Sequence, residues 1–409
     1  MSRFLKADAP TVGGEPLPYG RQLIDEADIA AVVQALRSNR LAHGPRVSEF
    51  ERSLAAVTGA RAAAACSSGT AALHLALASL DVGEGDLCVV PAITFLATAT
   101  AARFCGAEVA FADVDPQSGL MTGDGLAAAI SAAGRPVKAV LPVHLGGRIC
   151  DMEAIARHAR VAGALVVEDA CHAIGGADAK GRAVGDCAHS DAAAFSFHPV
   201  KTIAAGEGGA VTANDLDRVE RMRRLANQGV TKDPALLEDP ALSLDAHGQL
   251  NPWSYEQIEL GFNYRMNELE AALGLSQLSK LDRFVRRRRE LADLYDLSLA
   301  SFAPSVATAP ERLGDRAALH LYQVLIDFEG LDVSRADVMR TLSERGIGTQ
   351  VHYIPVYRQP YFFRRYGAQR LEGAESFYDR VLALPLFPAM SAEDVGRVVE
   401  ALGVALGIG

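Results

Sequence analysis

The sequence predicts an α/β protein with a large domain built on a mostly parallel sheet and a smaller α+β domain at its C-terminal end. Two observations lead to this prediction. Between residues 57 and 214, short apolar runs alternate with alanine-rich helical stretches, as in a parallel sheet covered by helices. At 409 residues, the chain is also longer than one hydrophobic core usually supports. We therefore expect a large domain over residues 1–301 and a small domain over residues 302–409.

The first elements expected are a helix at 26–38 and, after a loop, the sheet of the large domain. Six runs are predicted as strands because each is apolar almost throughout, as a strand buried on both faces should be. These runs lie at 87–90, 109–114, 139–144, 164–167, 192–197 and 210–212.

The second half of the chain continues with a long helical pattern at about 267–299. Its run of four arginines at 286–289 is interpreted as a solvated helix face, or alternatively as a contact to a nucleotide phosphate or a partner subunit. The small domain should then contain strands at 320–326 and 348–353 and helices at 335–345 and 391–402.

Composition excludes several classes of protein. The chain has no apolar stretch of roughly 18 residues and no apolar segment near its N-terminus, so neither a membrane span nor a signal peptide is predicted, and we expect a cytoplasmic protein. The six cysteines form no CxxC pair, which argues against a disulfide framework or a zinc site. A formal net charge of -10 argues against a nucleic-acid partner.

Lys201 is the first candidate for chemistry. It follows an apolar run and precedes a glycine-rich turn at 206–209. An ammonium group is strongly hydrated, so burial in a tight loop lowers the pKa of a lysine and frees its amine to form a Schiff base. The alternative is a loop lysine that simply extends to solvent.

Asp169 and His172 suggest what such a lysine would bind. A pyridoxal ring draws electrons only while its ring nitrogen stays protonated, and a buried carboxylate such as Asp169 can hold that proton. Asp169 could instead cap the helix that follows it. His172 could lie over the face of the same ring, or could be a structural histidine.

A third element is the segment Ser68, Gly69 and Thr70, which precedes a helical stretch at 71–80. Backbone N–H groups and hydroxyls at a helix N-terminus form an anion site that suits a cofactor phosphate, although small polar residues cap many helices. The full order is phosphate cradle, aspartate, Ser196 and lysine, all expected at the carboxyl edge of one sheet. The joint occurrence of these features in this order is much more specific for such a cofactor site than any one of them alone.

Four motifs, taken together, are similar to those of one enzyme family. They lie at 67–74, 168–175, 196–201 with 207–209, and 261–265. On these motifs nearly the whole chain resembles the sugar aminotransferases of the DegT/DnrJ/EryC/StrS family. The resemblance implies the PLP-dependent transferase fold, aspartate aminotransferase-like and of type I, with a seven-stranded sheet in the large domain.

The resemblance also implies the cofactor and its ligands. Lys201 would carry pyridoxal 5'-phosphate and Asp169 would pair with its pyridine nitrogen, so these two are the expected catalytic residues. Asn263 would reach the phosphate of the neighbouring subunit's cofactor, which implies a homodimer with shared active sites. The cofactor-binding set implied is Ser68, Gly69, Thr70, Phe95, Asp169, His172, Ser196, Lys201 and Asn263.

A narrower likeness concerns the substrate. The stretches 18–22, 198–201 and 351–356 resemble the UDP-4-amino-4,6-dideoxy-N-acetyl-β-L-altrosamine transaminases of pseudaminic acid synthesis. This implies transfer of the amino group of L-glutamate to the C4 ketone of a nucleotide-linked 4-keto-6-deoxy sugar, UDP-2-acetamido-2,6-dideoxy-β-L-arabino-hex-4-ulose. Other UDP-, dTDP- or GDP-linked keto sugars stay open. The candidate sugar contacts are Tyr19, His198, Arg265, His320 and His352, each with packing or exposure to solvent as the alternative.

Part of the pattern departs from this likeness, and other functions fit parts of it. The loop at 39–45 carries Arg40 and His43 where a small polar group and an aromatic are expected. Dehydratases on the same scaffold have histidine at the lysine position, so Lys201 favours amino transfer. A non-catalytic, cofactor-binding regulator would keep the fold without the reaction. A purely structural protein would leave a buried aspartate and lysine without purpose.

Overall fold

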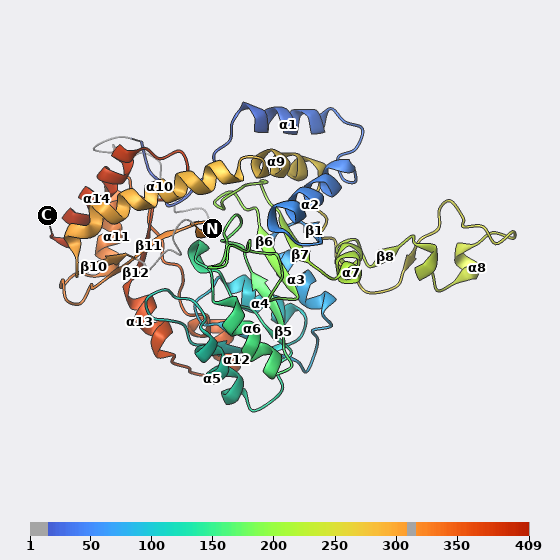
Figure 1. Ribbon diagram of the computed structural model, residues 1–409, viewed down its shortest axis with the longest axis horizontal. Coiled ribbons are helices and arrows are strands. Elements are labelled where there is room, and N and C mark those ends of the chain that lie inside the picture. The colour runs from blue at the N-terminus through green and yellow to red at the C-terminus, as the bar shows by residue number, and fades with distance from the viewer. Residues whose placement is uncertain (1–14, 309–315, 409) are drawn as a thin grey trace.

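The computed structural model describes residues 15–308 and 316–408, and its centre is a seven-stranded sheet in the order β1-β7-β6-β5-β4-β2-β3 (Figure 1). The pairs β6-β5, β5-β4, β4-β2 and β2-β3 are parallel, whereas β7 runs antiparallel to both β1 and β6. The predicted α/β class with a mostly parallel sheet is therefore confirmed. The strands are β1 Ala62–Cys66, β2 Leu87–Pro91, β3 Glu108–Ala112, β4 Ala139–Val140, β5 Leu165–Asp169, β6 Ala192–Ser196 and β7 Gly209–Ala213.

Two of these strands differ from the prediction. β1 was not predicted, because four of its five residues are alanine, which is depleted in strands and favoured in helices. β4 is only two residues long, where a strand over 139–144 was expected. Beyond it the chain stays close to β5 through a single bridge between Val143 and Asp169.

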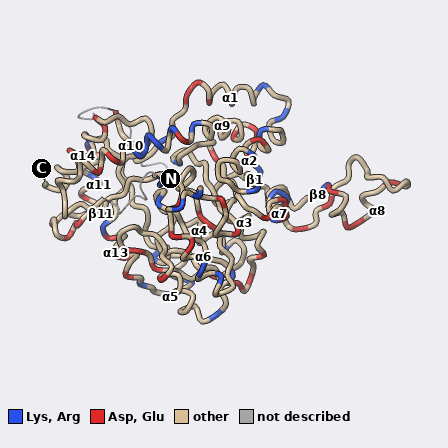
Figure 2. Tube along the Cα trace, viewed as in Figure 1, with Lys and Arg blue, Asp and Glu red and all other residues tan. Residues whose placement is uncertain are grey.

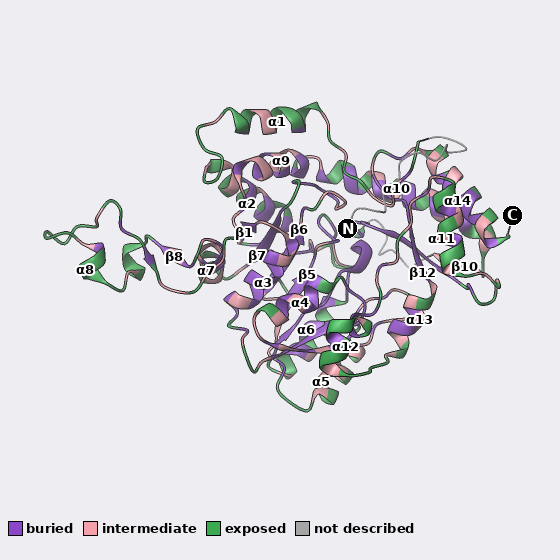
Figure 3. Cartoon of the chain, turned by 180° about the vertical axis from the view of Figure 1, so that it is seen from behind, coloured by how far each residue is buried: buried purple, intermediate pink, exposed green. Residues whose placement is uncertain are grey.

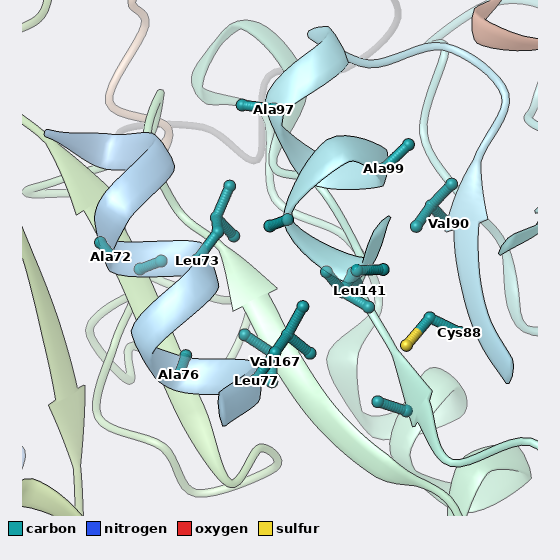
Figure 4. Close-up of a cluster of buried hydrophobic side chains, with 14 of the residues drawn as sticks. Ala72, Leu73, Ala76, Leu77, Cys88, Val90, Ala97, Ala99, Leu141 and Val167 are labelled. Atoms are coloured by element: carbon teal, nitrogen blue, oxygen red, sulfur yellow. The ribbon is translucent and has the colours of Figure 1, made fainter. Parts of the chain in front are cut away.

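Helices cover both faces of the sheet, and each face has its own apolar core. On one face lie α3 Gly69–Ser79, α4 Leu96–Phe104 and α7 Leu216–Ala226, which all contribute to one apolar core. Figure 4 shows alanines and leucines of α3 and alanines of α4 beside the strands. On the other face lie α2 Pro45–Thr58, α5 Gly123–Ala133, α6 Met152–Val161 and α9 Glu268–Leu278. α1 Glu26–Leu36 lies outside α9 and is largely exposed on its outer side (Figure 3). The sheet is therefore buried on both faces, as its apolar strands predict.

A second, three-stranded antiparallel sheet lies toward the C-terminal end, in the order β10-β11-β12. It packs with the helices around it into a separate apolar core that also includes Leu17. α12 and α13, in contrast, contribute to the core of the large sheet. The elements of this part are β10 Val306–Thr308, β11 Tyr322–Ile326, β12 Val381–Leu384, α11 Arg335–Glu344, α12 Pro360–Tyr366, α13 Glu372–Arg380 and α14 Ala392–Leu406.

The strand predicted at 348–353 is wrong. Only Gln350 pairs with the small sheet, exchanging backbone hydrogen bonds of 3.2 and 2.8 Å with Ala383. The chain then turns away, and Val351, His352 and Tyr353 line a cavity instead. The residues whose pattern suggested a strand therefore form part of a cavity wall.

The helical pattern at 267–299 is two helices, α9 and α10 Leu281–Leu299. α10 contributes Phe284 and Val285 to the core behind the large sheet and Leu291 and Tyr295 to the core of the small sheet. The domain boundary proposed after residue 301 therefore comes just after α10, a helix that packs in the cores of both sheets. The first 14 residues of the proposed large domain lie outside the described residues.

The arginine run lies on α10, among the basic stretches that Figure 2 marks in blue. Arg286 is exposed, as expected of a solvated face, but the other three arginines are not fully solvated. Arg288 is fully buried and donates to the carbonyls of His320 and Leu386 at 3.2 and 2.7 Å. Arg287 and Arg289 donate to the carbonyls of Met390 and Ala317. These arginines therefore tie α10 to the loops around the small sheet.

A thin arm projects from the body of the molecule between α7 and α9 (Figure 1). It contains β8 Val230–Thr231, the short helix α8 Pro240–Ser243 and β9 Glu256–Gln257, with β8 and β9 antiparallel. Trp253, the single tryptophan of the chain, lies on this arm and is 72% exposed. In the part of the chain that the structure describes, no helix has both the length and the apolarity to cross a membrane.

Candidate active site

A cavity of about 490 Å³ lies where the strands of the large sheet end and the loops begin. Its walls come from the loop before α3, the start of α4, the ends of β5 and β6, and the segment 350–354 that leaves the small sheet. The predicted site residues that line it are Tyr19, Ser68, Gly69, Thr70, Phe95, Asp169, His172, Ser196, His198, Lys201 and His352. Segments distant in sequence therefore converge on one site at the carboxyl edge of the sheet.

Lys201 is held in a short loop that follows β6. Its backbone N–H donates to the His198 carbonyl at 2.8 Å, and the Ala205 N–H donates to the Phe197 carbonyl at 2.8 Å, which closes the loop. The side chain lines the cavity, and burial lowers the pKa of its amine, although Cys171 and Asp169 oppose the shift. A lowered pKa increases the fraction of neutral amine, which is the nucleophilic form.

Asp169 ends β5 and is only 5% exposed. Its Oδ2 accepts a hydrogen bond of 2.7 Å from the Thr98 hydroxyl, and its Oδ1 accepts one of 3.2 Å from the Cys171 N–H. Thr98 is in turn 2.7 Å from the hydroxyl of Thr94. The carboxylate is thus fixed in one orientation by the first turn of α4 and by the loop that follows β5.

His172 lies beside Asp169 and is held from both sides. The Gly146 N–H donates to its Nδ1 at 3.2 Å, and its Nε2 is 3.3 Å from the Tyr353 hydroxyl. Burial lowers the pKa of His172 well below the usual range, and the nearby positive charge of Lys201 adds to the effect. The imidazole is therefore neutral.

The N-terminus of α3 forms a cradle of small residues. The Ser68 hydroxyl caps the helix by accepting from the Ala71 N–H at 3.1 Å, and first-turn N–H groups such as those of Gly69 and Thr70 have no partner within a helix. A Cβ on Gly69 would lie 2.7 Å from Cβ of Ser196, and one on Gly209 would lie 2.2 Å from the Ser68 carbonyl oxygen. The two glycines therefore let the start of α3 pack closely against the end of β6 and the start of β7, and the unpaired N–H groups of this helix N-terminus fit a phosphate group.

Three predicted residues lie outside the cavity. Asn263 is exposed and its backbone forms a bridge with Asn227. Arg265 donates to the side chain of Asn227 at 3.0 Å and lines a second cavity of about 610 Å³, together with Arg40 and His43. His320 is buried behind His172, with 4.6 Å between the two ring centroids.

Two residues at this site, Thr98 and Tyr353, were not predicted from the sequence. Thr98 contacts Asp169, and Tyr353 lines the cavity and contacts His172. Thr98 lies within a helix and Tyr353 comes from the far end of the chain, so neither spacing nor strand ends pointed to them. The sequence signals that could have found them are Thr94, a hydroxyl residue four positions before Thr98, and the position of Tyr353 next to His352 in the stretch 351–356.

The donor set fits pyridoxal phosphate, because the cavity combines an anion cradle, a carboxylate, an amine of lowered pKa and flat aromatic side chains. The fold and the site thus define a pyridoxal-phosphate-dependent transferase. Residues 22–403 match the model of the DegT/DnrJ/EryC1/StrS aminotransferase family. The chain belongs to this family of sugar aminotransferases.

Known relatives cover nearly the whole chain. The spore coat polysaccharide biosynthesis protein SpsC of Bacillus subtilis is 37% identical over 389 residues, which is 94% of this chain and 96% of SpsC. The structure of Helicobacter pylori PseC, an aminotransferase of pseudaminic acid biosynthesis, superposes with a TM-score of 0.86 at 27% identity, covering 96% of this chain and 100% of PseC.

Two further aminotransferases are similar in structure. DesV of S. venezuelae, solved in complex with a ketimine intermediate, has a TM-score of 0.81 at 30% identity, covering 96% and 99% of the two chains. The sugar aminotransferase Spr1654 of Streptococcus pneumoniae, solved in its PLP form, has a TM-score of 0.84 at 26% identity, covering 96% of this chain and 99% of Spr1654.

Proposed function

We propose that this protein transfers the amino group of L-glutamate to the C4 ketone of a nucleotide-linked 4-keto-6-deoxy sugar. The observation that carries the proposal is the meeting of Lys201, Asp169 and the α3 cradle in one cavity. Pyridoxal phosphate, when bound there, supplies an aldehyde that takes up the amino group and a ring that stabilises negative charge on the adjoining carbon.

The residues of the chain would divide the work. Gly69, Thr70 and Ser196 would bind the phosphate at the N-terminus of α3, and Asp169 would hold a proton at the ring nitrogen. Phe95 and His172 would orient the ring from its two faces. Binding and orientation of this kind account for much of the rate enhancement of a cofactor enzyme.

Lys201 would hold the cofactor through Nζ and then act as the proton carrier. In the first half of the reaction it would move a proton from the α carbon of L-glutamate to C4′ of the cofactor, and in the second half it would move a proton from C4′ to C4 of the sugar. The neutral amine favoured by its lowered pKa is the form that can accept a proton.

As the particular substrate we propose UDP-2-acetamido-2,6-dideoxy-β-L-arabino-hex-4-ulose of the pseudaminic acid pathway. The overall likeness to PseC supports this choice. The higher identity to SpsC favours a second candidate, a different nucleotide-linked keto sugar destined for a polysaccharide. The residues that we propose to contact the sugar are Tyr19, His198 and His352 from this cavity, and Arg265.

The test is to incubate the purified protein with pyridoxal phosphate, L-glutamate and this keto sugar and to follow the sugar by mass spectrometry. A product with the mass expected for exchange of ketone for amine supports the reaction and the substrate. If no product forms but the absorbance of the cofactor still responds to L-glutamate, amino transfer remains the proposed reaction and this sugar is rejected as the substrate. An absorbance that does not respond to L-glutamate rejects the reaction and favours a regulator.

We further propose that two copies of the chain share their active sites, with Asn263 contacting the cofactor phosphate of the neighbouring copy. Its exposure, away from the cavity of its own chain, supports this role. Mixing inactive Lys201→Ala and Asn263→Ala subunits tests it, since each mixed dimer has one intact site. Random exchange should restore about a quarter of the wild-type activity. No recovery, despite subunit exchange shown by mass spectrometry of the native protein, would contradict the shared site.

A further inference from the structure

The hydrogen bonds of His172 fix the position of its proton. Nδ1 faces the backbone N–H of Gly146 at 3.2 Å, and an N–H can only donate, so Nδ1 must be the unprotonated acceptor. A neutral imidazole carries one proton, which is therefore on Nε2. Burial, together with the positive charges of Lys201 and Arg148, lowers the pKa of the ring and keeps it neutral.

This tautomer determines what the Tyr353 hydroxyl does. Nε2 of His172 lies 3.3 Å from that hydroxyl and donates its proton to it. The hydroxyl has one hydrogen and cannot point it back at an N–H group. Among the described residues, His172 is the one hydrogen-bond partner of this hydroxyl, so its own hydrogen is left for a group outside the chain.

The surroundings of Tyr353 show where that group must be. Tyr353 lines the active-site cavity, with its ring centroid 5.9 Å from that of Phe95, which lies on the same wall, and 6.2 Å from that of His172. Burial raises the pKa of Tyr353, and the nearby Asp169, Tyr19 and Cys171 raise it further. The phenol therefore stays protonated over the working range of pH and remains a donor.

We propose that Tyr353 is a ligand-contacting residue of this site, whose hydroxyl, oriented by His172, donates a hydrogen bond to an acceptor oxygen of the molecule held in the cavity. The inference rests on the proposed function for the identity of that molecule. The oxygen belongs either to the pyridoxal ring or to one of the two substrates, and the chemistry of recognition is the same in each case.

The test compares wild-type holoenzyme with Tyr353→Phe, which removes the oxygen and keeps the ring. Loss of one hydrogen bond to a ligand should weaken its binding three- to tenfold. If the oxygen belongs to the cofactor, the Kd of pyridoxal phosphate rises and the absorbance maximum of the bound cofactor shifts without any substrate. If it belongs to a substrate, these two values stay constant and the concentration for half-maximal reaction rises for L-glutamate or for the keto sugar, with a smaller effect on kcat.

Tyr357→Phe is the matched control. Tyr357 is a buried tyrosine four residues away, whose hydroxyl donates to Glu375 at 2.6 Å outside the cavity. Its removal should change stability without changing any ligand readout.

The tautomer can be measured separately. Nitrogen-15 NMR of the imidazole of His172 should show the proton on Nε2. A proton on Nδ1, or a Tyr353→Phe holoenzyme that matches wild type within twofold in every ligand readout, overturns the inference. If wild type responds to neither L-glutamate nor keto sugar, the proposed function fails, and the cofactor measurements alone decide the role of Tyr353.

Discussion

The Thr98 hydroxyl donates a hydrogen bond of 2.7 Å to Oδ2 of Asp169, and this contact ties the first turn of α4 to the end of β5. Phe95, the N-cap residue of α4, lies on the cavity wall with 54% of its surface exposed. One helix start therefore supports both the carboxylate and the aromatic wall that we propose for the cofactor.

Replacing Thr98 by valine should weaken cofactor binding. The change keeps the shape of the side chain but removes the donor to Asp169, so the Kd of pyridoxal phosphate should rise three- to tenfold. Thr212→Val is the control, because Thr212 is equally buried and its hydroxyl donates to Gly185 at 2.8 Å away from the cavity. Both variants should lose about 1–2 kcal/mol of unfolding free energy, and equal cofactor affinity in the two would argue against the role of Thr98.

Replacing Gly69 by alanine should close the phosphate cradle. The new Cβ would lie 2.7 Å from Cβ of Ser196, so either Ser196 or the start of α3 must move. We expect at least a tenfold weaker affinity for pyridoxal phosphate and a loss of about 1–3 kcal/mol in stability. Gly396→Ala, within α14 and with no atom near the added Cβ, should instead stabilise the protein by about 0.5–1 kcal/mol. Calorimetry and cofactor titration of both variants check these values.

Replacing Lys201 by alanine should abolish turnover while the protein stays folded. Borohydride treatment of wild-type holoenzyme should attach the cofactor to the peptide that contains Lys201, and the variant should take up none. Lys280→Ala is the matched lysine control: Lys280 pairs with Asp25 and Asp28, away from the cavity. That variant should be less stable but active, and an active Lys201→Ala enzyme would contradict the assignment.

Stability should fall as the pH decreases from about 6.5 to 5. Burial lowers the pKa of His172 and His320 well below the usual 6.5, and that of His352 to about 3. In this range the unfolded chain binds protons that the folded protein does not, so acid favours unfolding. Each histidine should contribute about 2 kcal/mol of loss at pH 5.

Denaturant titrations at several pH values measure this slope. Burial also lowers the pKa of His74, so His320→Leu removes one of four such groups and should reduce the slope by about a quarter to a third. His247→Asn, at an exposed position on the arm, should leave the slope unchanged. A slope that is the same in wild type and His320→Leu would show that His320 does not contribute to it.

Much of the large sheet could be predicted because its strands are continuous apolar runs that end in polar residues. The clearest example is β5, an apolar run that ends in the polar residues Glu168 and Asp169. β1 escaped prediction since its alanines fit a helix as well as a strand. The depth of burial of Arg288 could not be predicted either, because charge patterning alone predicts exposure and the carbonyls that satisfy this side chain come from two distant loops.

The site residues that could be predicted are those whose type is required by the reaction. Residues that matter only because of their contacts in the folded protein could not be predicted. Asp169 is an unusual residue for a buried strand end and Lys201 is unusual in a tight loop between two apolar strands, so each stands out in the sequence. Thr98 and Tyr353 are ordinary residues whose importance depends on which atoms they meet after folding. Their contribution follows from long-range packing, which the spacing of residues does not encode.

The helix α10, 19 residues and about 28 Å long, has a mechanical consequence. Its first half is packed behind the large sheet and its second half beside the small one, with Arg288 anchored near the middle. Swinging one part against the other would require bending this helix and breaking its hydrogen bonds. We therefore expect the large and small parts to move as one rigid unit and to unfold in one cooperative transition. Access to the cavity would then be controlled by the loops around it and not by a hinge between the two parts.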